Sequence, residues 1–143
     1  MDRGQWIGER RAAVVAEYDP EAATYDRFPY PNEVQRKWVR RLLLTCPAGG
    51  LVLDAACGTG QYFSVVAEAG LRVVGTDQSA GMLAQARARG IALETHHIGL
   101  QELNFVARFD AAMTIDATEN VAPEDWPSCW PTSTGPNRPM TVL

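Results

Sequence analysis

Cysteine is scarce in this sequence, and long apolar runs and an excess of positive charge are lacking. The three cysteines, Cys46, Cys57 and Cys129, stand far apart without a C-x-x-C pair, which excludes a disulfide framework and a paired-cysteine zinc site. No apolar stretch approaches the roughly 20 residues that span a bilayer, and the N-terminus lacks the form of a signal peptide. With 13 basic and 17 acidic residues the net charge is −4, which disfavours a nucleic-acid partner. We therefore expect a cytoplasmic protein with reduced thiols and no membrane contact.

The first third of the chain shows helical periodicity. A short helix is expected at residues 9–16, followed by irregular chain. Asn32 is a suitable N-cap for a second helix over residues 33–44. The expected apolar face of this helix consists of Val34, Trp38 and Leu42. Its other side is rich in arginine, and we interpret it as a solvated face because the whole chain is acidic.

Beyond residue 50 the pattern changes to short apolar runs that alternate with helical segments. Strands are expected at residues 51–56, 71–76, 91–95 and 109–115. Helices are expected at residues 61–69 and 80–89, the second of them capped by Ser79. Such alternation is typical of βαβ units with right-handed crossovers. The sequence therefore predicts an α/β fold, with a parallel sheet of about four core strands and helices on both faces.

A glycine turn follows the first predicted strand, and an acid ends the second. The turn reads Asp54-Ala55-Ala56-Cys57-Gly58-Thr59-Gly60. Glycines at this point permit a close approach of a ligand to backbone N–H groups, and the following helix N-terminus suits an anion. Asp77 lies where a carboxylate can accept two hydrogen bonds from a ribose diol. Together these features predict a nucleotide-type cofactor.

Two classes of cofactor share this layout. A dinucleotide site requires a small residue at the third position of G-x-G-x-x-G/A, but Phe63 stands there. Asp54 would also repel a diphosphate, whereas S-adenosylmethionine (SAM) carries no phosphate and has an ammonium group that an acid can meet. The residues thus favour SAM, and an NAD-type dehydrogenase is the alternative.

Residues 53–60 and 75–83 resemble motif I and the following acidic loop of class I SAM-dependent methyltransferases. The similarity extends from about Tyr18 to Trp126. It implies a Rossmann-like fold with SAM as cofactor and a small-molecule methyl acceptor as partner. By this resemblance the cofactor-binding residues are Tyr25, Asp54, Gly58, Gly60, Asp77, Gln78, Met82 and Gln101. Tyr25 would belong to a lid, Asp77 would hold the ribose, and Gln78, Met82 and Gln101 would lie beside the adenine.

The resemblance also points to the reacting end of the site. Asp116, just past the fourth strand, matches the position that faces the transferred methyl group, and Glu119 follows in the same loop. Both are candidate catalytic residues, because a general base is needed only for a poor nucleophile. No metal site is expected, since adjacent His96 and His97 point to opposite sides of a strand. Met82 has an alternative role as a core residue.

The C-terminal end departs from the family. Five of the nine prolines fall in the last 21 residues, and about four of the family's seven strands are recognisable. We therefore expect a cap segment at residues 1–31, a SAM-binding domain at residues 32–127 and an irregular or disordered tail at residues 128–143. Truncation or a frameshift after about residue 127 is our hypothesis. It would leave the fourth strand as an exposed edge able to self-associate, and a catalytically incomplete SAM-binding fragment is the alternative to an active methyltransferase.

Overall fold

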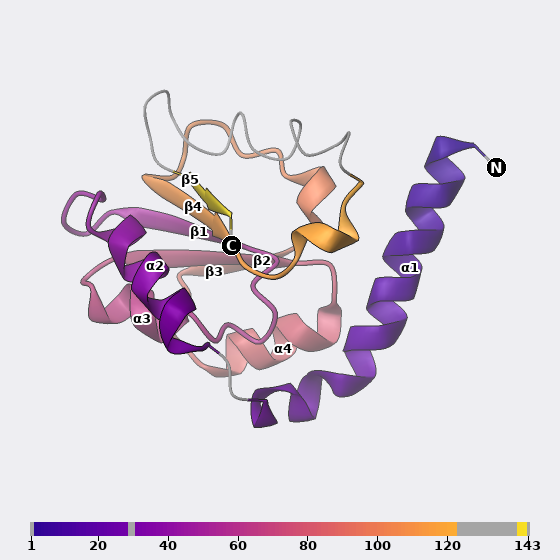
Figure 1. Cartoon of the computed structure of the whole chain (residues 1–143), viewed down its shortest axis with the longest axis horizontal. Helices are drawn as coiled ribbons and strands as arrows, with labels where there is room; N and C mark the ends of the chain where they lie inside the picture. The colour runs from indigo at the N-terminus through magenta and orange to yellow at the C-terminus, as the bar shows by residue number, and fades with distance from the viewer. Residues whose placement is uncertain (1, 29–30, 123–139, 143) are drawn as a thin grey trace.

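The computed structural model describes residues 2–28, 31–122 and 140–142. Its strands are β1 (Leu51–Ala55), β2 (Arg72–Asp77), β3 (Glu94–His97), β4 (Ala111–Thr114) and β5 (Met140–Val142). Its helices are α1 (Arg3–Glu21), α2 (Glu33–Leu43), α3 (Phe63–Glu68) and α4 (Ala80–Ala88), with 3₁₀-helices η1 (Ala22–Arg27), η2 (Leu100–Glu102) and η3 (Thr118–Asn120). The predicted α/β fold with a parallel sheet is confirmed (Figure 1).

The strand order is β3-β2-β1-β4-β5, and neighbouring strands are parallel. The chain moves outward from β1 to β3 and then returns to the other side of β1 with β4. In such a sheet, ligands bind outside the carboxyl ends of the strands where the order reverses. Asp54, whose register partners are Gly75 on β2 and Met113 on β4, lies close to that point.

The two faces of the sheet are covered differently. On one face α2, α3 and α4 bury Val39, Phe63 and Leu83 against strand residues such as Val52 and Val73. The other face is covered by η2, η3 and their flanking segments, and its buried cluster includes Leu53, Val74, Leu100, Phe109 and Val121. Helices therefore lie on both faces, and those on the second face in the described chain are short 3₁₀ turns.

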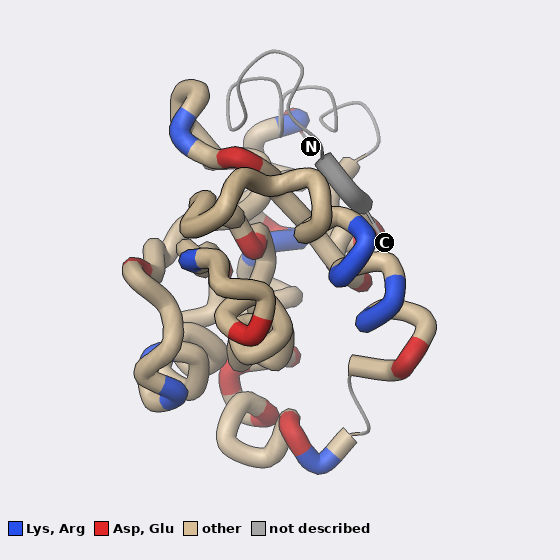
Figure 2. The backbone as a smooth tube through the Cα atoms, turned by 90° about the vertical axis from the view of Figure 1, so that its left-hand side faces the viewer, with Lys and Arg blue, Asp and Glu red and all other residues tan. Residues whose placement is uncertain are grey.

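Helix α2 begins as predicted but buries a different face. The Asn32 side chain accepts from the Gln35 N–H, and the Gln35 side chain accepts from the Asn32 N–H, so that a capping box is formed. The predicted apolar face is wrong for Val34, which is 65% exposed, and for Trp38, which is 44% exposed, whereas Leu42 is buried as predicted. The buried residues of α2 are Val39, Leu42 and Leu43. Both sets have helical spacing, and packing on the sheet selects the second. Basic positions recur along the tube of this helix (Figure 2).

The N-terminal helix is longer than predicted. It extends from Arg3 to Glu21, with Asp2 as its N-cap and Pro20 in its last turn. The chain then tightens into η1, where the Ala22 N–H bonds to the Asp19 carbonyl oxygen. Figure 1 shows α1 at the side of the domain, where its C-terminal end lies against α4. None of the helices in the described segments is long and apolar enough to cross a membrane.

Strand β5 changes the predicted picture of the sheet edge. It pairs in parallel with β4, with Ala112 opposite Met140. The prediction of an irregular tail is therefore wrong for residues 140–142, and so is the prediction that β4 forms an exposed edge. Residues 123–139, on which the frameshift hypothesis rests, lie outside the described residues. Strand β3 begins three residues later than the predicted start at residue 91.

Candidate functional site

A cavity of about 550 Å³ opens at the carboxyl ends of β1, β2 and β4, with α1 and η1 as its outer wall. Of the predicted site residues, it is lined by Tyr25, Asp54, Gly58, Asp77, Gln78, Met82, Gln101, Asp116 and Glu119. Residues from six segments of the chain therefore meet as predicted. Gly60 is the predicted residue that does not line this cavity.

Gly60 has a packing role instead. Its φ is +77°, and a Cβ atom there would lie 2.6 Å from Cε2 of Phe63. The same ring lies against Gly75, where an added Cβ would be 2.6 Å from Cζ of Phe63. Phe63 is fully buried. The two glycines therefore make room for the ring of Phe63. This is the bulky residue that departs from the G-x-G-x-x-G/A pattern of dinucleotide sites.

The turn between β1 and α3 is held by backbone bonds to β2. Ala56 (φ 58°) and Gly58 (φ 55°) both have left-handed backbone conformations. The Cys57 N–H donates to the Thr76 carbonyl oxygen over 2.8 Å, and the Gly58 N–H donates to Oδ2 of Asp77 over 2.8 Å. The glycine turn and the predicted ribose-binding acid thus form one unit.

Asp77 is bonded through both carboxylate oxygens. Oδ1 accepts from the Ser79 N–H over 2.8 Å, while Oδ2 accepts from Gly58. Burial raises the pKa of Asp77, and these backbone donors oppose that rise. A carboxylate has more acceptor sites than these bonds fill, which leaves capacity for a ligand hydroxyl. Ser79 caps α4 as predicted, since its Oγ accepts from the Met82 N–H.

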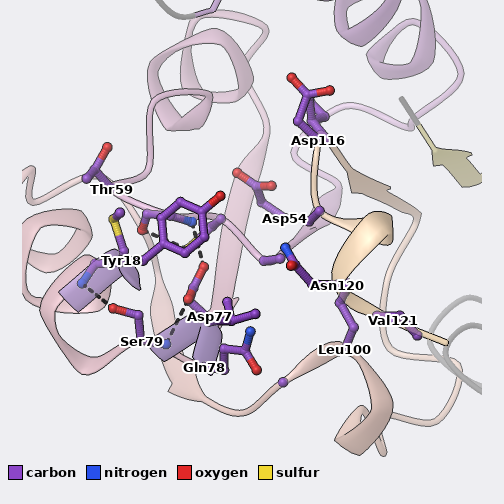
Figure 3. Close-up of a pocket in the computed structure, with 18 of the residues that line it drawn as sticks. Tyr18, Asp54, Thr59, Asp77, Gln78, Ser79, Leu100, Asp116, Asn120 and Val121 are labelled. Carbon is purple, nitrogen blue, oxygen red and sulfur yellow. Dashed lines mark hydrogen bonds between the residues drawn. The ribbon is translucent and has the colours of Figure 1, made fainter. Parts of the chain in front are cut away.

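Asp54 is the most unusual group in the cavity (Figure 3). Its side chain is almost fully buried, and its Oδ2 has no hydrogen-bond partner among the described residues. Burial, aided by the nearby charge of Asp77, raises the pKa of Asp54 to about 8. An unpartnered buried carboxyl is costly unless a ligand pairs with it. A cationic group entering from the cavity would provide that partner.

At another end of the cavity, side chains of α1 and η2 are bonded to each other. Arg11 donates from Nε to Oε1 of Gln101 over 3.1 Å and pairs with Glu102 over 3.0 Å. Gln78 lies on the adjacent side, and its carbonyl oxygen is 2.8 Å from Nε2 of His97. Arg11, Gln78 and Gln101 line the cavity together with Leu100, so that polar and apolar groups meet at this end. Arg11 was not predicted, because no local pattern signals a contact across 90 residues.

Two tyrosines of the N-terminal segment cover the cavity. Tyr25 was predicted, whereas Tyr18 was not assigned a site role although its ring faces the same cavity (Figure 3). Their rings meet edge to face with centroids 6.1 Å apart. Burial, with the negative charges of Glu17 and neighbouring acids, raises the pKa of Tyr18. Its hydroxyl therefore remains a donor at neutral pH.

The candidate catalytic acids follow β4, Asp116 in the loop after the strand and Glu119 in η3. Asp116 is exposed and has φ 50°, a conformation that is uncommon outside glycine and often found at functional sites. Nε2 of Gln35 donates to its Oδ2 over 2.8 Å. Glu119 is also exposed, and its carbonyl oxygen accepts from Arg10. Both acids border the cavity.

A family model described as a methyltransferase domain matches residues 52–132. A malonyl-[acyl-carrier protein] O-methyltransferase of Pectobacterium atrosepticum is 42% identical over 84 residues, 57% of this chain and 32% of that protein. The protein of the same name from Serratia marcescens is 36% identical over 107 residues, 73% of this chain and 40% of that protein. The chain therefore spans less than half the length of these relatives.

Solved structures share the fold at low sequence identity. The DhpI–SAH complex superposes with a TM-score of 0.74 at 22% identity, covering 93% of this chain and 69% of that one. Magnesium protoporphyrin IX methyltransferase from Synechocystis with bound SAM gives a TM-score of 0.66 at 19% identity, covering 84% of this chain and 68% of that one. These likenesses establish the Rossmann-like architecture that the sequence predicts.

Proposed function

The chain belongs to the methyltransferase-domain family, and from this membership we propose that it binds SAM and transfers the methyl group to a small-molecule acceptor. The membership confirms the assignment to class I SAM-dependent methyltransferases made from the sequence. The single observation that carries the proposal is the joint placement of Asp54 and Asp77 in one cavity beside the glycine turn. SAM combines a cationic amino-acid end with a ribose diol, and these acids offer a partner for each.

Five of the predicted residues have a defined task in cofactor binding under this proposal. Asp77 accepts from the ribose hydroxyls through the lone pairs that Gly58 and Ser79 leave available. Asp54 receives the positive charge of the methionine end, which satisfies its unpartnered oxygen. Gln78, Met82 and Gln101 flank the adenine. The polar atoms of the cavity thereby match the polar groups of the cofactor along its length.

The protein's contribution to methyl transfer is chiefly alignment. The sulfonium is a strong electrophile when bound, and positioning of the acceptor can supply several kcal/mol of rate acceleration. A carboxylate acceptor requires no base, whereas a hydroxyl requires proton removal. Asp116, exposed at the cavity and oriented by Gln35, is placed to accept such a proton. The relatives named O-methyltransferases support an oxygen nucleophile.

A turnover assay tests this function. The purified chain is incubated with methyl-labelled SAM and a panel of carboxylic acids and phenols, and labelled product is measured beside S-adenosylhomocysteine (SAH). Methylated product that disappears in Asp77→Asn supports the proposal. SAH binding without turnover on any acceptor would instead support the catalytically incomplete fragment.

A further inference from the structure

Each of the two tyrosines over the cavity is followed by an aspartate that contacts the body of the domain. The pairs are Tyr18-Asp19 and Tyr25-Asp26. In each pair the tyrosine faces the cavity, while the aspartate bonds to the scaffold around it. The repeated arrangement places ligand contact and anchoring on neighbouring residues.

Asp26 connects η1 to the glycine turn and to the end of α4. Its Oδ1 accepts from Oγ1 of Thr59 over 2.6 Å and from Nε2 of Gln61 over 2.9 Å. Its Oδ2 pairs with Arg89, which also donates from Nε to the Thr59 carbonyl oxygen. Thr59 is buried in the turn. The Asp26 carboxylate thus holds η1, together with the end of α1 (the lid segment), against the glycine turn that lines the cavity.

Asp19 anchors the other end of the same segment. Its Oδ1 accepts from Oγ of Ser79 and from the Gly81 N–H. These bonds lower the pKa of Asp19, so that it is ionised at neutral pH. Gly81 permits the close approach, since a Cβ there would lie 3.0 Å from the Asp19 carbonyl oxygen. Ser79 in turn donates its N–H to Asp77.

Apolar packing contributes little to holding this segment. Helix α1 has no buried residue, and Ala22 is the one buried residue of η1. Val14, Val15 and Tyr18 are half-buried, and a segment with so few buried apolar side chains gains limited stabilisation from the hydrophobic effect. Its position over the cavity therefore depends on the polar contacts of the two aspartates and of Arg11.

We propose that Asp19 and Asp26 are positioning residues, which hold Tyr18 and Tyr25 against the bound cofactor, and that breaking the Asp26 contacts limits cofactor release. This inference rests on the proposed SAM-binding function. Tyr18 and Tyr25 line the cavity from this segment, so that movement of the segment away from the domain widens the exit for a ligand. Because Asp26 bonds to three side chains across that boundary and does not itself line the cavity, its loss speeds release by freeing the segment from the glycine turn and α4.

The test is the dissociation rate of SAH, measured by stopped-flow displacement. Asp26→Asn keeps the side-chain size and loses the charged contact with Arg89. We expect its release rate to rise about tenfold, as for the loss of about 1.4 kcal/mol of charged hydrogen bonding. Arg89→Gln removes the other half of the contact and should give a similar rise, with the double variant little faster than either single one.

Glu21→Gln is the matched control. Glu21 lies in the same segment and pairs only with exposed Arg27 among the described contacts, so that this variant loses the same charge without freeing the lid. Its release rate should equal that of the wild type. High salt should speed release from the wild type and leave Asp26→Asn nearly unchanged, an effect that a merely structural role would not produce.

The outcomes separate the anchoring role of Asp26 from the proposed binding of SAM. Equal release rates for Asp26→Asn, Arg89→Gln and the control, in chains that bind SAH, would overturn the anchoring role alone. Failure of the folded wild type to bind SAH would overturn the proposed function and this inference with it.

Discussion

The buried acid Asp54 leads to a pH-dependent prediction for cofactor binding. Its pKa in the ligand-free chain is about 8, so the carboxyl holds a proton at neutral pH, whereas a cationic ligand requires the ionised form. If binding requires ionisation, the ionised fraction rises from about 1% at pH 6 to about one half at pH 8, and the association constant rises about fifty-fold. Binding then releases close to one proton below pH 7.

Calorimetric titration with SAM at pH 6, 7 and 8, in buffers of different ionisation enthalpy, measures both quantities. Asp54→Asn cannot ionise and should bind weakly with little dependence on pH. Glu68→Gln, a change at an exposed acid of α3, should reproduce the wild-type profile. A wild-type affinity that is equal at pH 6 and pH 8, or a rise retained in Asp54→Asn, would refute the reasoning.

The same group makes a prediction about the stability of the ligand-free chain. The folded-state pKa of Asp54, about 8, lies above its ordinary value of 3.8, so the folded chain holds a proton that the unfolded chain releases. Its contribution to the free energy of unfolding is full below about pH 4 and is lost as the pH rises through 8. Burial raises the pKa of Asp77 in the same direction. The melting temperature should therefore fall between pH 5.5 and pH 8, and fall less in Asp54→Asn; an unchanged slope in the variant would contradict this.

Two further substitutions test the fold, and a third tests the role of Asp116. Asn32→Ala removes the capping box of α2 and should cost about 1 kcal/mol of unfolding free energy in urea titrations; no loss would show that the cap is dispensable. Phe63→Ala empties the space between Gly60 and Gly75 and should cost about 3–5 kcal/mol in the same titrations, whereas a cost below 1 kcal/mol would mean that the site collapses. Gln35→Glu keeps the capping box but sets a carboxylate against Asp116, so the pH profile of turnover should shift upward while SAH affinity stays constant; an unshifted profile would exclude Asp116 as the base.

The local parts of the site could be predicted because their signals lie within short stretches of chain. The strand, glycine turn and helix around residues 51–68 and the acid that ends β2 are each specified by neighbouring residues. Ser79 as a cap is equally local. Once the sheet is parallel, the carboxyl ends of its strands must meet at one edge, so these motifs indicate a shared cavity without further knowledge.

The missed features depend on contacts between distant segments. Asp19 reaches Ser79 across 60 residues, and Arg11 reaches Gln101 across 90, distances at which no sequence periodicity applies. The buried face of α2 was mistaken because Val34 and Trp38 fit helical spacing as well as Val39 does, and packing on the sheet decides between them. Strand β5 escaped prediction because a three-residue segment after many prolines carries no recognisable strand pattern.

The measurement that tests the central claim most directly is a calorimetric titration of the chain with SAH, beside Asp77→Asn. Asp77 anchors both the glycine turn and the start of α4 through its two oxygens, so thermal unfolding of the variant must be recorded in parallel. Saturable binding by the wild type, weakened at least about tenfold in a folded Asp77→Asn chain, is the predicted result. Absence of binding by the folded wild type, or undiminished binding by the folded variant, would contradict the assignment of this cavity as the cofactor site.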